Sequence, residues 1–260
     1  MARISITWLG HASFLFMGEG GDRIYFDPWI SGNPKCPITL DEVTAADVVV
    51  CSHGHSDHLG QSVEICRKTG AILIGSPEVC NFAHRFGVEN NRQSRPMNIG
   101  GTVRVHDCAY TMVQATHSTS MAGPRYAAER IAEPDGAVCG FFLQWDNGIV
   151  VYDAADTGVF GDMALFSQMY GPQIAILPVG GKYTMGVREA ARAASLIRPE
   201  VVIPCHYDTF PDQAADIGEL ARQVADLSPQ TRVAALEYGV PWVFERPETG
   251  DRGREDAETG

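Results

Sequence analysis

The chain has 260 residues, of which 45% are hydrophobic and 20% charged, so its composition is that of a folded globular protein and excludes wholesale disorder. Its 20 basic and 32 acidic residues give a net charge of −12, which disfavours binding to nucleic acids or to anionic membranes. No apolar stretch is long enough to span a membrane, and the alternating start of the chain is not typical of a signal peptide. Seven cysteines without a CxxC spacing suit a reducing compartment, so we expect a cytoplasmic protein.

The first half of the chain is rich in strand patterns, in which apolar and β-branched residues lie between turn residues. The predicted strands are 4–8, 13–17, 23–26, 47–51, 71–75, 102–105, 109–115, 137–144 and 149–152. The strand at 47–51 is almost entirely apolar, which predicts burial on both faces. Helices are expected from about 58 to 68 and over 77–86.

In the second half, strands alternate with helices, which favours an α/β fold with mixed sheets. The predicted helices are 162–170, 187–197 and about 213–226, and the strands between them are 173–177 and 200–204. A final hairpin is expected from 232–236 and 242–244. From Glu245 the chain is charged and poor in apolar residues, so we expect a single domain over 1–244 and a disordered tail over 245–260.

The strongest chemical signal is a segment that follows the buried strand and opens a helix: Ser52-His53-Gly54-His55-Ser56-Asp57-His58. Three imidazoles and a carboxylate within six residues are a dense set of ligands for zinc, manganese, iron or nickel. Single candidates follow three later strands: His117, Asp156 and His206. Ligands gather beyond the carboxyl ends of strands in open α/β sheets, so these seven side chains predict a metal centre.

This series resembles the metallo-β-lactamase superfamily, which carries an HxHxDH motif, a single His, an Asp before Thr-Gly and a final His. Five further segments narrow the resemblance to uncharacterised metal-dependent hydrolases close to the ascorbate-6-phosphate lactonases and the N-acyl-phosphatidylethanolamine phospholipases D. These segments are Trp8-Leu-Gly-His-Ala12, Phe26-Asp-Pro28, Gly32-Asn-Pro34, Tyr183-Thr-Met-Gly186 and His206-Tyr-Asp-Thr-Phe210. The resemblance covers about residues 3–225 and implies a four-layer αββα sandwich with two mixed β-sheets and the metals at one edge.

The resemblance also implies a binuclear site. His53, His55 and His117 would bind the first ion, Asp57, His58 and His206 would bind the second, and Asp156 would bridge them. Two divalent ions are therefore expected, with Zn²⁺ preferred and Mn²⁺, Fe²⁺ or Ni²⁺ as alternatives. Such a pair lowers the pKa of bound water toward neutrality, which provides a nucleophile.

Other residues have open roles. Asp57 and His11 are the expected catalytic groups, although His11, like Asp27, has a supporting structural role as its alternative. Asp153 is the rival of Asp156 for the bridging position.

The expected substrate contacts are Ser118, Lys182 and Arg125. Arg125 lies in a long connection, 121–135, which suggests a lid or substrate loop.

The sequence thus predicts a hydrolase of small-molecule esters or lactones, amides or phosphodiesters. The alternatives are a nuclease of the same superfamily, which the acidic charge disfavours, an iron-dependent redox enzyme, or a non-catalytic metal-binding module. A small-molecule substrate is the expected partner, without nucleic acid or membrane, and homo-oligomers are an expectation from the resemblance alone.

Overall fold

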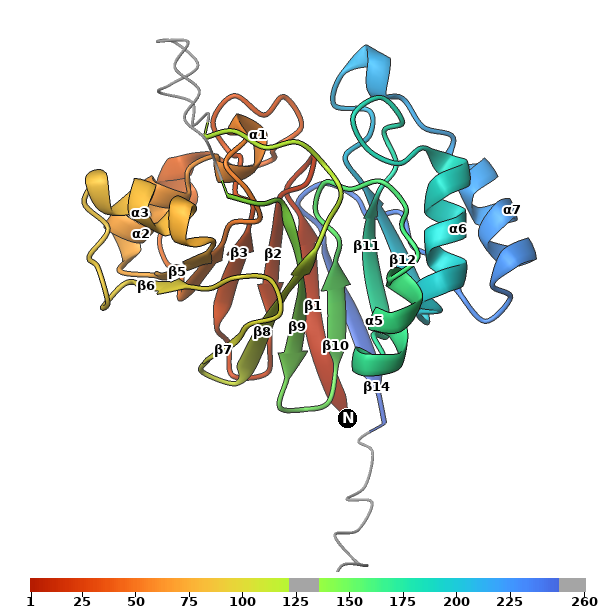
Figure 1. The fold of residues 1–260 in the computed structure, drawn as a ribbon, viewed down its shortest axis with the longest axis horizontal. Helices are drawn as coiled ribbons and strands as arrows, with labels where there is room; N and C mark the ends of the chain where they lie inside the picture. Colours follow the sequence, from red (N-terminus) through yellow and green to blue (C-terminus); the bar gives the residue numbers. More distant parts are fainter. Residues whose placement is uncertain (122–135, 248–260) are drawn as a thin grey trace, which may run out of the picture.

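Two seven-stranded sheets pack against each other in the computed structural model, which describes residues 1–121 and 136–247 (Figure 1). The first sheet has the order β14 (Pro241–Arg246), β1 (Ala2–Trp8), β2 (Phe14–Met17), β3 (Arg23–Phe26), β4 (Val48–Val50), β5 (Ile72–Gly75) and β6 (Ser94–Pro96). The second has the order β13 (Arg232–Val233), β12 (Val201–Cys205), β11 (Ile174–Pro178), β10 (Val150–Asp153), β9 (Cys139–Trp145), β8 (Cys108–Gln114) and β7 (Thr102–Val105). Both sheets are mixed, as predicted.

Helices cover the outer faces of the sheets, so the architecture is the predicted αββα sandwich (Figure 1). On the first sheet lie α2 (Ser62–Thr69) and α3 (Pro77–Arg85), with α1 (Ser56–Leu59) at its edge. On the second lie α5 (Met163–Tyr170), α6 (Val187–Ile197) and α7 (Ile217–Leu227). Two short 3-10 helices, η1 (Leu40–Glu42) and η2 (Pro211–Gln213), interrupt the connections. Within the described residues, no helix is long and apolar enough to cross a lipid bilayer.

The core between the sheets follows from the alternation of side chains along the strands. In β1, Ile4, Ile6 and Trp8 point into this core and are at most 1% exposed. In β4, Val48 and Val50 join the same core, whereas Val49 packs in the second core beneath the helices. The nearly all-apolar strand is therefore buried on both faces, as its sequence predicted.

The predicted helix from 58 to 68 is wrong as one element, because it is broken between α1 and α2 at Gly60. This glycine has φ +44°, and a Cβ there would lie 2.3 Å from the carbonyl oxygen of Pro28. The same carbonyl accepts a hydrogen bond from the backbone N–H of Gln61. The close passage of segment 28–29 fixes the break, and it depends on a tertiary contact that periodicity does not report.

The predicted C-terminal hairpin is also wrong. Strand β13 pairs in parallel with β12 in the second sheet, whereas β14 pairs antiparallel with β1 in the first sheet. Strand β14 includes Glu245 and Arg246, opposite Arg3 and Ala2, so the folded domain extends beyond the predicted limit at 244. Charged residues fit there because β14 is an edge strand with exposed side chains. The rest of the predicted tail, from residue 248, lies outside the described residues. Strand β6 was not among the strands predicted from the sequence.

Replacing Gly60 with alanine should destabilise the fold more than the same change at Gly70. Both glycines have positive φ, but nothing lies within 4 Å of a Cβ at Gly70. Gly70→Ala should cost roughly 1 kcal/mol from backbone conformation alone. Gly60→Ala should cost roughly 3 kcal/mol or more, because segment 28–29 must also move. Urea denaturation of both variants measures the difference, and equal losses would contradict the importance of this close approach.

Candidate metal centre

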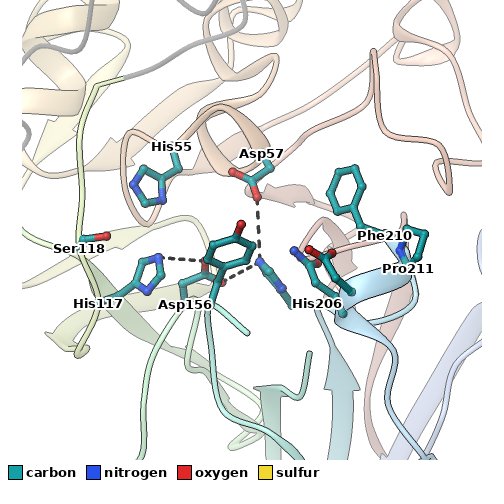
Figure 2. A pocket seen from close by; sticks show the side chains of 11 residues that line it. His55, Asp57, His117, Ser118, Asp156, His206, Phe210 and Pro211 are labelled. Atoms are coloured by element: carbon teal, nitrogen blue, oxygen red, sulfur yellow. Dashed lines mark ion pairs between the residues drawn. The ribbon is translucent and has the colours of Figure 1, made fainter. Parts of the chain in front are cut away.

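The seven predicted ligands come from four loops that meet at one edge of the sandwich. His53 and His55 follow β4, Asp57 and His58 lie in α1, and the other three follow β8, β10 and β12. Both sheets therefore contribute side chains to one place, the upper edge in Figure 1. Figure 2 shows that His55, Asp57, His117, Asp156 and His206 face a common space.

One ligand group contains the residues expected for the first ion. His53, His55, His117 and Asp156 each offer a ligand atom, and these atoms all lie within 4.8 Å of one another. The nearest pair is His53 Nε2 and His55 Nδ1, at 3.0 Å. His53 is fully buried, whereas His55 and His117 are partly exposed, so solvent reaches the group at these two rings.

A second group contains His11, Asp57, His58 and His206, whose ligand atoms also lie within 4.8 Å of one another. Three of them are the residues expected for the second ion. The fourth, His11, was predicted near the site without a ligand position. The sequence did not predict that His11 belongs to this group, because His11 lies on a turn far along the chain from the HxHxDH segment.

Asp156 belongs to the first group and also contacts two members of the second. Its Oδ2 is 3.3 Å from His58 Nε2 and 3.4 Å from His117 Nε2, and its Oδ1 is 3.4 Å from His206 Nε2. The side chain is almost fully buried, and burial opposes its charge, but His206 and His58 hold the carboxyl pKa well below its usual range. Asp156 therefore contacts histidines of both ligand groups.

Asp153, the rival for this position, belongs to neither group. It is buried, its Oδ1 accepts a hydrogen bond from the backbone N–H of Ala155, and its Oδ2 has no partner. Burial raises its carboxyl pKa well above the usual range, so its surroundings disfavour the charged form that a metal ligand needs.

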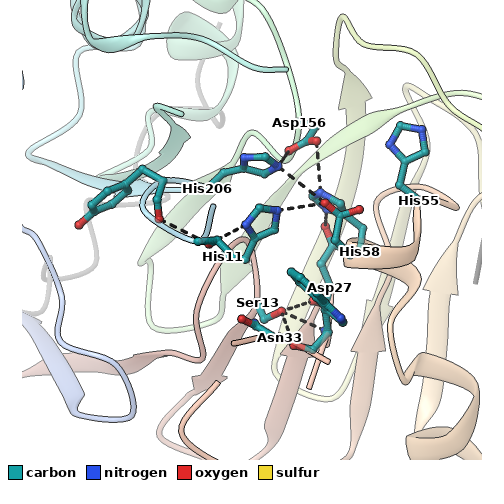
Figure 3. A network of polar contacts seen from close by, with 12 residues as sticks. His11, Ser13, Asp27, Asn33, His55, His58, Asp156 and His206 are labelled. Atoms are coloured by element: carbon teal, nitrogen blue, oxygen red, sulfur yellow. Dashed lines mark hydrogen bonds and ion pairs between the residues drawn. The ribbon is translucent and has the colours of Figure 1, made fainter. Parts of the chain in front are cut away.

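Asp27 acts on two candidate ligands, on His58 directly (Figure 3) and on His53 through Ser52. Its Oδ2 lies 2.7 Å from His58 Nδ1 and accepts a hydrogen bond of 2.5 Å from the Ser52 hydroxyl. Because a carboxylate only accepts, His58 donates from Nδ1, so the neutral form of His58 presents Nε2 as a ligand. The Ser52 hydroxyl donates its proton to Asp27. Its oxygen therefore accepts a hydrogen bond from His53 Nδ1, 2.9 Å away. One buried carboxylate thus turns the Nε2 lone pairs of both histidines toward the site.

His11 orients Asp57. His11 Nε2 lies 3.0 Å from Asp57 Oδ2 and Nδ1 lies 2.9 Å from the Thr209 hydroxyl. Burial, with a smaller contribution from His206, lowers the His11 pKa to about 4, so the ring is neutral at pH 7 and donates from Nε2 to the carboxylate. Burial raises the pKa of Asp57, but this hydrogen bond and nearby His58 outweigh it and hold the pKa well below its usual range.

The backbone at the site is strained. Five non-glycine residues there have φ between 44° and 55°: His11, Asp27, Ala155, His206 and Asp208. Such conformations persist only where the surroundings hold them, and they cluster at functional sites. The carbonyl of His11 accepts hydrogen bonds from His206 N–H and from Trp8 Nε1, which ties together the loops after β1 and β12.

An open cavity of about 760 Å³ leads to the ligands. Its described walls are His55, Asp57, His117, Ser118, Asp156, Tyr183, His206, Phe210, Pro211, Asp212 and Gln213. Ser118 therefore reaches the cavity, consistent with its predicted position, whereas Lys182 does not line it and pairs instead with Asp212. Arg125 and most of the predicted loop 121–135 lie outside the described residues.

Residues 5–206 match the sequence profile of the β-lactamase superfamily domain. The chain belongs to this superfamily. It is 44% identical to a UPF0173 metal-dependent hydrolase of Methanopyrus kandleri, over 90% of this chain and 97% of that protein. It is 41% identical to a UPF0173 metal-dependent hydrolase of Koribacter versatilis, over 85% and 91%. The structure of Igni18, a metallo hydrolase from Ignicoccus hospitalis, is similar with a TM-score of 0.81 and 34% identity, over 94% of this chain and all of that one. The protein is a metal-dependent hydrolase.

The side chains at the centre of this superfamily site fit a metal. His58 Nε2 and Asp156 Oδ1 are buried and make no hydrogen bond of normal geometry. Buried polar atoms without partners are costly, and cations would satisfy both. Imidazole nitrogens and carboxylate oxygens are the donors that zinc and its neighbours bind.

Asp27→Asn should weaken metal binding without unfolding the protein. An asparagine amide has only one oxygen that accepts hydrogen bonds, whereas both oxygens of Asp27 accept them. The hydrogen bonds that hold the ring protons of His58 and His53 on Nδ1 would therefore be disturbed. We expect a loss of about 10- to 100-fold in metal affinity, measured by competition with a chelator. Asp47→Asn is the control, because Asp47 also accepts a backbone hydrogen bond, from Arg23 N–H, but lies outside the ligand groups. Equal effects at both positions would contradict the assignment.

The metal-free protein should lose stability as the pH falls from about 6.5 toward 4. The His11 ring takes up a proton in the unfolded chain within this window and stays neutral when folded, so acid favours unfolding. The lowered pKa values of His53, His55 and His117, each due mainly to burial, act in the same direction.

His58 acts in the opposite direction, because Asp156 and Asp27 outweigh its burial and raise its pKa well above 6.5. Its stabilisation is complete below pH 6.5 and is lost as the pH rises through the folded value. Urea denaturation across this pH range measures the balance. His11→Asn should reduce the slope by up to about 1.4 kcal/mol per pH unit, and an unchanged slope would contradict a neutral, buried His11.

Proposed function

We propose that this metal-dependent hydrolase holds two divalent ions, with Zn²⁺ preferred, and hydrolyses an ester or lactone, an amide or a phosphodiester of a small molecule. The observation that carries the proposal is that Asp156, a member of the first ligand group, also lies 3.3 Å from His58 and 3.4 Å from His206 of the second group. A single carboxylate shared by two groups suits a pair of cations, since an anion between them offsets their repulsion.

In this proposal, His53, His55 and His117 hold the first ion, and Asp57, His58 and His206 hold the second. Divalent ions bound there would supply Lewis acidity and activate water for attack at neutral pH. Asp27 keeps His53 and His58 in the ligating tautomer, and the loops after β1 and β12 hold His206 in place.

Asp57 and His11 are proposed to act as a pair. The Asp57 side chain is 29% exposed and lines the cavity, whereas the His11 ring is fully buried behind it. The neutral His11 ring donates to Oδ2 and so fixes the direction of the carboxylate. Asp57 is therefore held as an anion at the cavity wall, where it can accept a hydrogen bond from water that enters the site and so orient that water.

We also propose a cytoplasmic location and a small-molecule substrate. All seven cysteines are free thiols and six of them are buried, which supports a reducing compartment. The cavity, of about 760 Å³, has the size of sites for small molecules, and the net charge of −12 disfavours nucleic acid.

Metal analysis and substrate screening of the purified protein test this proposal. About two equivalents of metal per chain are expected, together with hydrolysis within a panel of lactones, esters, amides and phosphodiesters. His55→Ala combined with His58→Ala should remove the metal and lower hydrolysis by about a thousandfold or more. His106→Asn, at an exposed histidine outside the ligand groups, should retain both. Full activity in the double variant would refute the assignment.

A further inference from the structure

The cavity has two chemically different sides. Figure 2 shows His55, His117 and Ser118 on one side, and Phe210 with Pro211 on the other, next to His206. Tyr183 also lines the cavity. We refer to Tyr183, Phe210 and Pro211 as the aromatic wall. Phe210 adjoins the ligands proposed for the second ion, because it lies next to His206 in Figure 2 and near His11, so a substrate bound there would contact this ring.

The rings of the aromatic wall are exposed, although large apolar side chains are usually buried. Tyr183 is 56% exposed and Phe210 is 40% exposed. Exposed apolar surface within a cavity is a common feature of ligand sites.

The Phe210 ring is held in place rather than loose on the surface. It stacks on Trp29 with ring centroids 6.2 Å apart and an angle of 24°, and its centroid lies 6.1 Å from that of His11. Phe210 also precedes η2, whose first residue, Pro211, has a fixed φ. A flat apolar surface that is already ordered loses little entropy when it binds a ligand.

The charges near this wall do not favour an anion. Among the described residues that line the cavity there is no lysine or arginine, and Asp212 adds a carboxylate. The nearby cation, Lys182, forms an ion pair with Asp212 and lies 4.9 Å from the centroid of the Tyr183 ring. The pair is neutral as a unit, so an anionic group would have to compete with Asp212 for the amine.

We propose that the aromatic wall binds an uncharged, flat apolar group of the substrate, next to the bond that is hydrolysed. This inference rests on the proposed function and narrows its substrates. An aryl or similarly flat apolar ester, lactone or amide fits the wall, whereas a substrate with a phosphate or carboxylate in that place does not.

Three hydroxamates that share one metal-chelating group test the inference by binding alone. Acetohydroxamate carries a methyl group, benzohydroxamate a phenyl ring and succinic monohydroxamate a carboxylate. Isothermal titration into the metal-loaded protein should show that benzohydroxamate binds at least about tenfold more tightly than acetohydroxamate. Succinic monohydroxamate should bind no more tightly than acetohydroxamate.

Variants of the wall should remove this preference. Phe210→Ala combined with Tyr183→Ala should reduce the ratio of the benzohydroxamate and acetohydroxamate affinities to below about threefold. Because both probes bind the metal through the same hydroxamate group, a change in metal binding alters both affinities equally and leaves their ratio unchanged. Leu227→Ala is the control, because Leu227 is 47% exposed and lies outside the cavity, and it should keep the wild-type ratio. Asp212→Ala, which frees Lys182, should improve binding of succinic monohydroxamate.

Three results would overturn the inference: a wild-type ratio below about threefold, a ratio unchanged in the double variant, or tightest binding of the anionic probe. Failure of the proposed function is distinguishable, because acetohydroxamate would then not bind even to the wild-type protein. That result would contradict the proposed metal site, and the inference that rests on it would fail as well.

Discussion

The carboxylate of Asp156 joins the two halves of the site, and the rest of the arrangement depends on its contacts. It is 2% exposed and lies 3.3 to 3.4 Å from imidazole nitrogens that three separate loops supply. Three imidazoles around one buried anion would repel one another if all were charged. The low pKa of His117, due mainly to burial, and the high pKa of His58, due to Asp156 and Asp27, show how the protein divides this charge.

Residues that do not themselves line the cavity hold this centre together. Asp27 acts on His58 directly and on His53 through Ser52, and the His11 carbonyl binds the backbone of His206. These contacts link the loops of the first sheet to a loop of the second. The positive φ values at His11, Asp27 and His206 are the conformational cost of bringing the loops together, and the packed sandwich maintains them.

The cavity combines candidate metal ligands with the proposed aromatic wall. The ligand groups lie at the edge of the sandwich, whereas Tyr183, Phe210 and the Lys182–Asp212 pair lie at the rim of the cavity. Loop residues supported by a rigid scaffold are where substrate preference usually resides. These rim residues are therefore the ones that we propose select the substrate.

Much of the fold follows from local sequence. The strand at Val48–Val50, the helix that opens at Pro77 and the alternation of β11, α6 and β12 were predictable, because periodicity and turn residues act over short distances. The seven candidate ligands were also predictable, since so dense a set of histidines and aspartates at strand ends is chemically distinctive.

Only the tertiary structure decided how distant segments meet. The break at Gly60 depends on the carbonyl of Pro28, and the separation of β13 from β14 depends on which sheet each strand joins. The proton positions that Asp27 imposes, the place of His11 among the ligands and the pairing of Lys182 with Asp212 are likewise contacts across many residues. Sequence by itself determined which chemical groups this protein carries. Packing decided which atoms of those groups face one another, because hydrogen bonds and ion pairs act over a few ångströms in space and not along the chain.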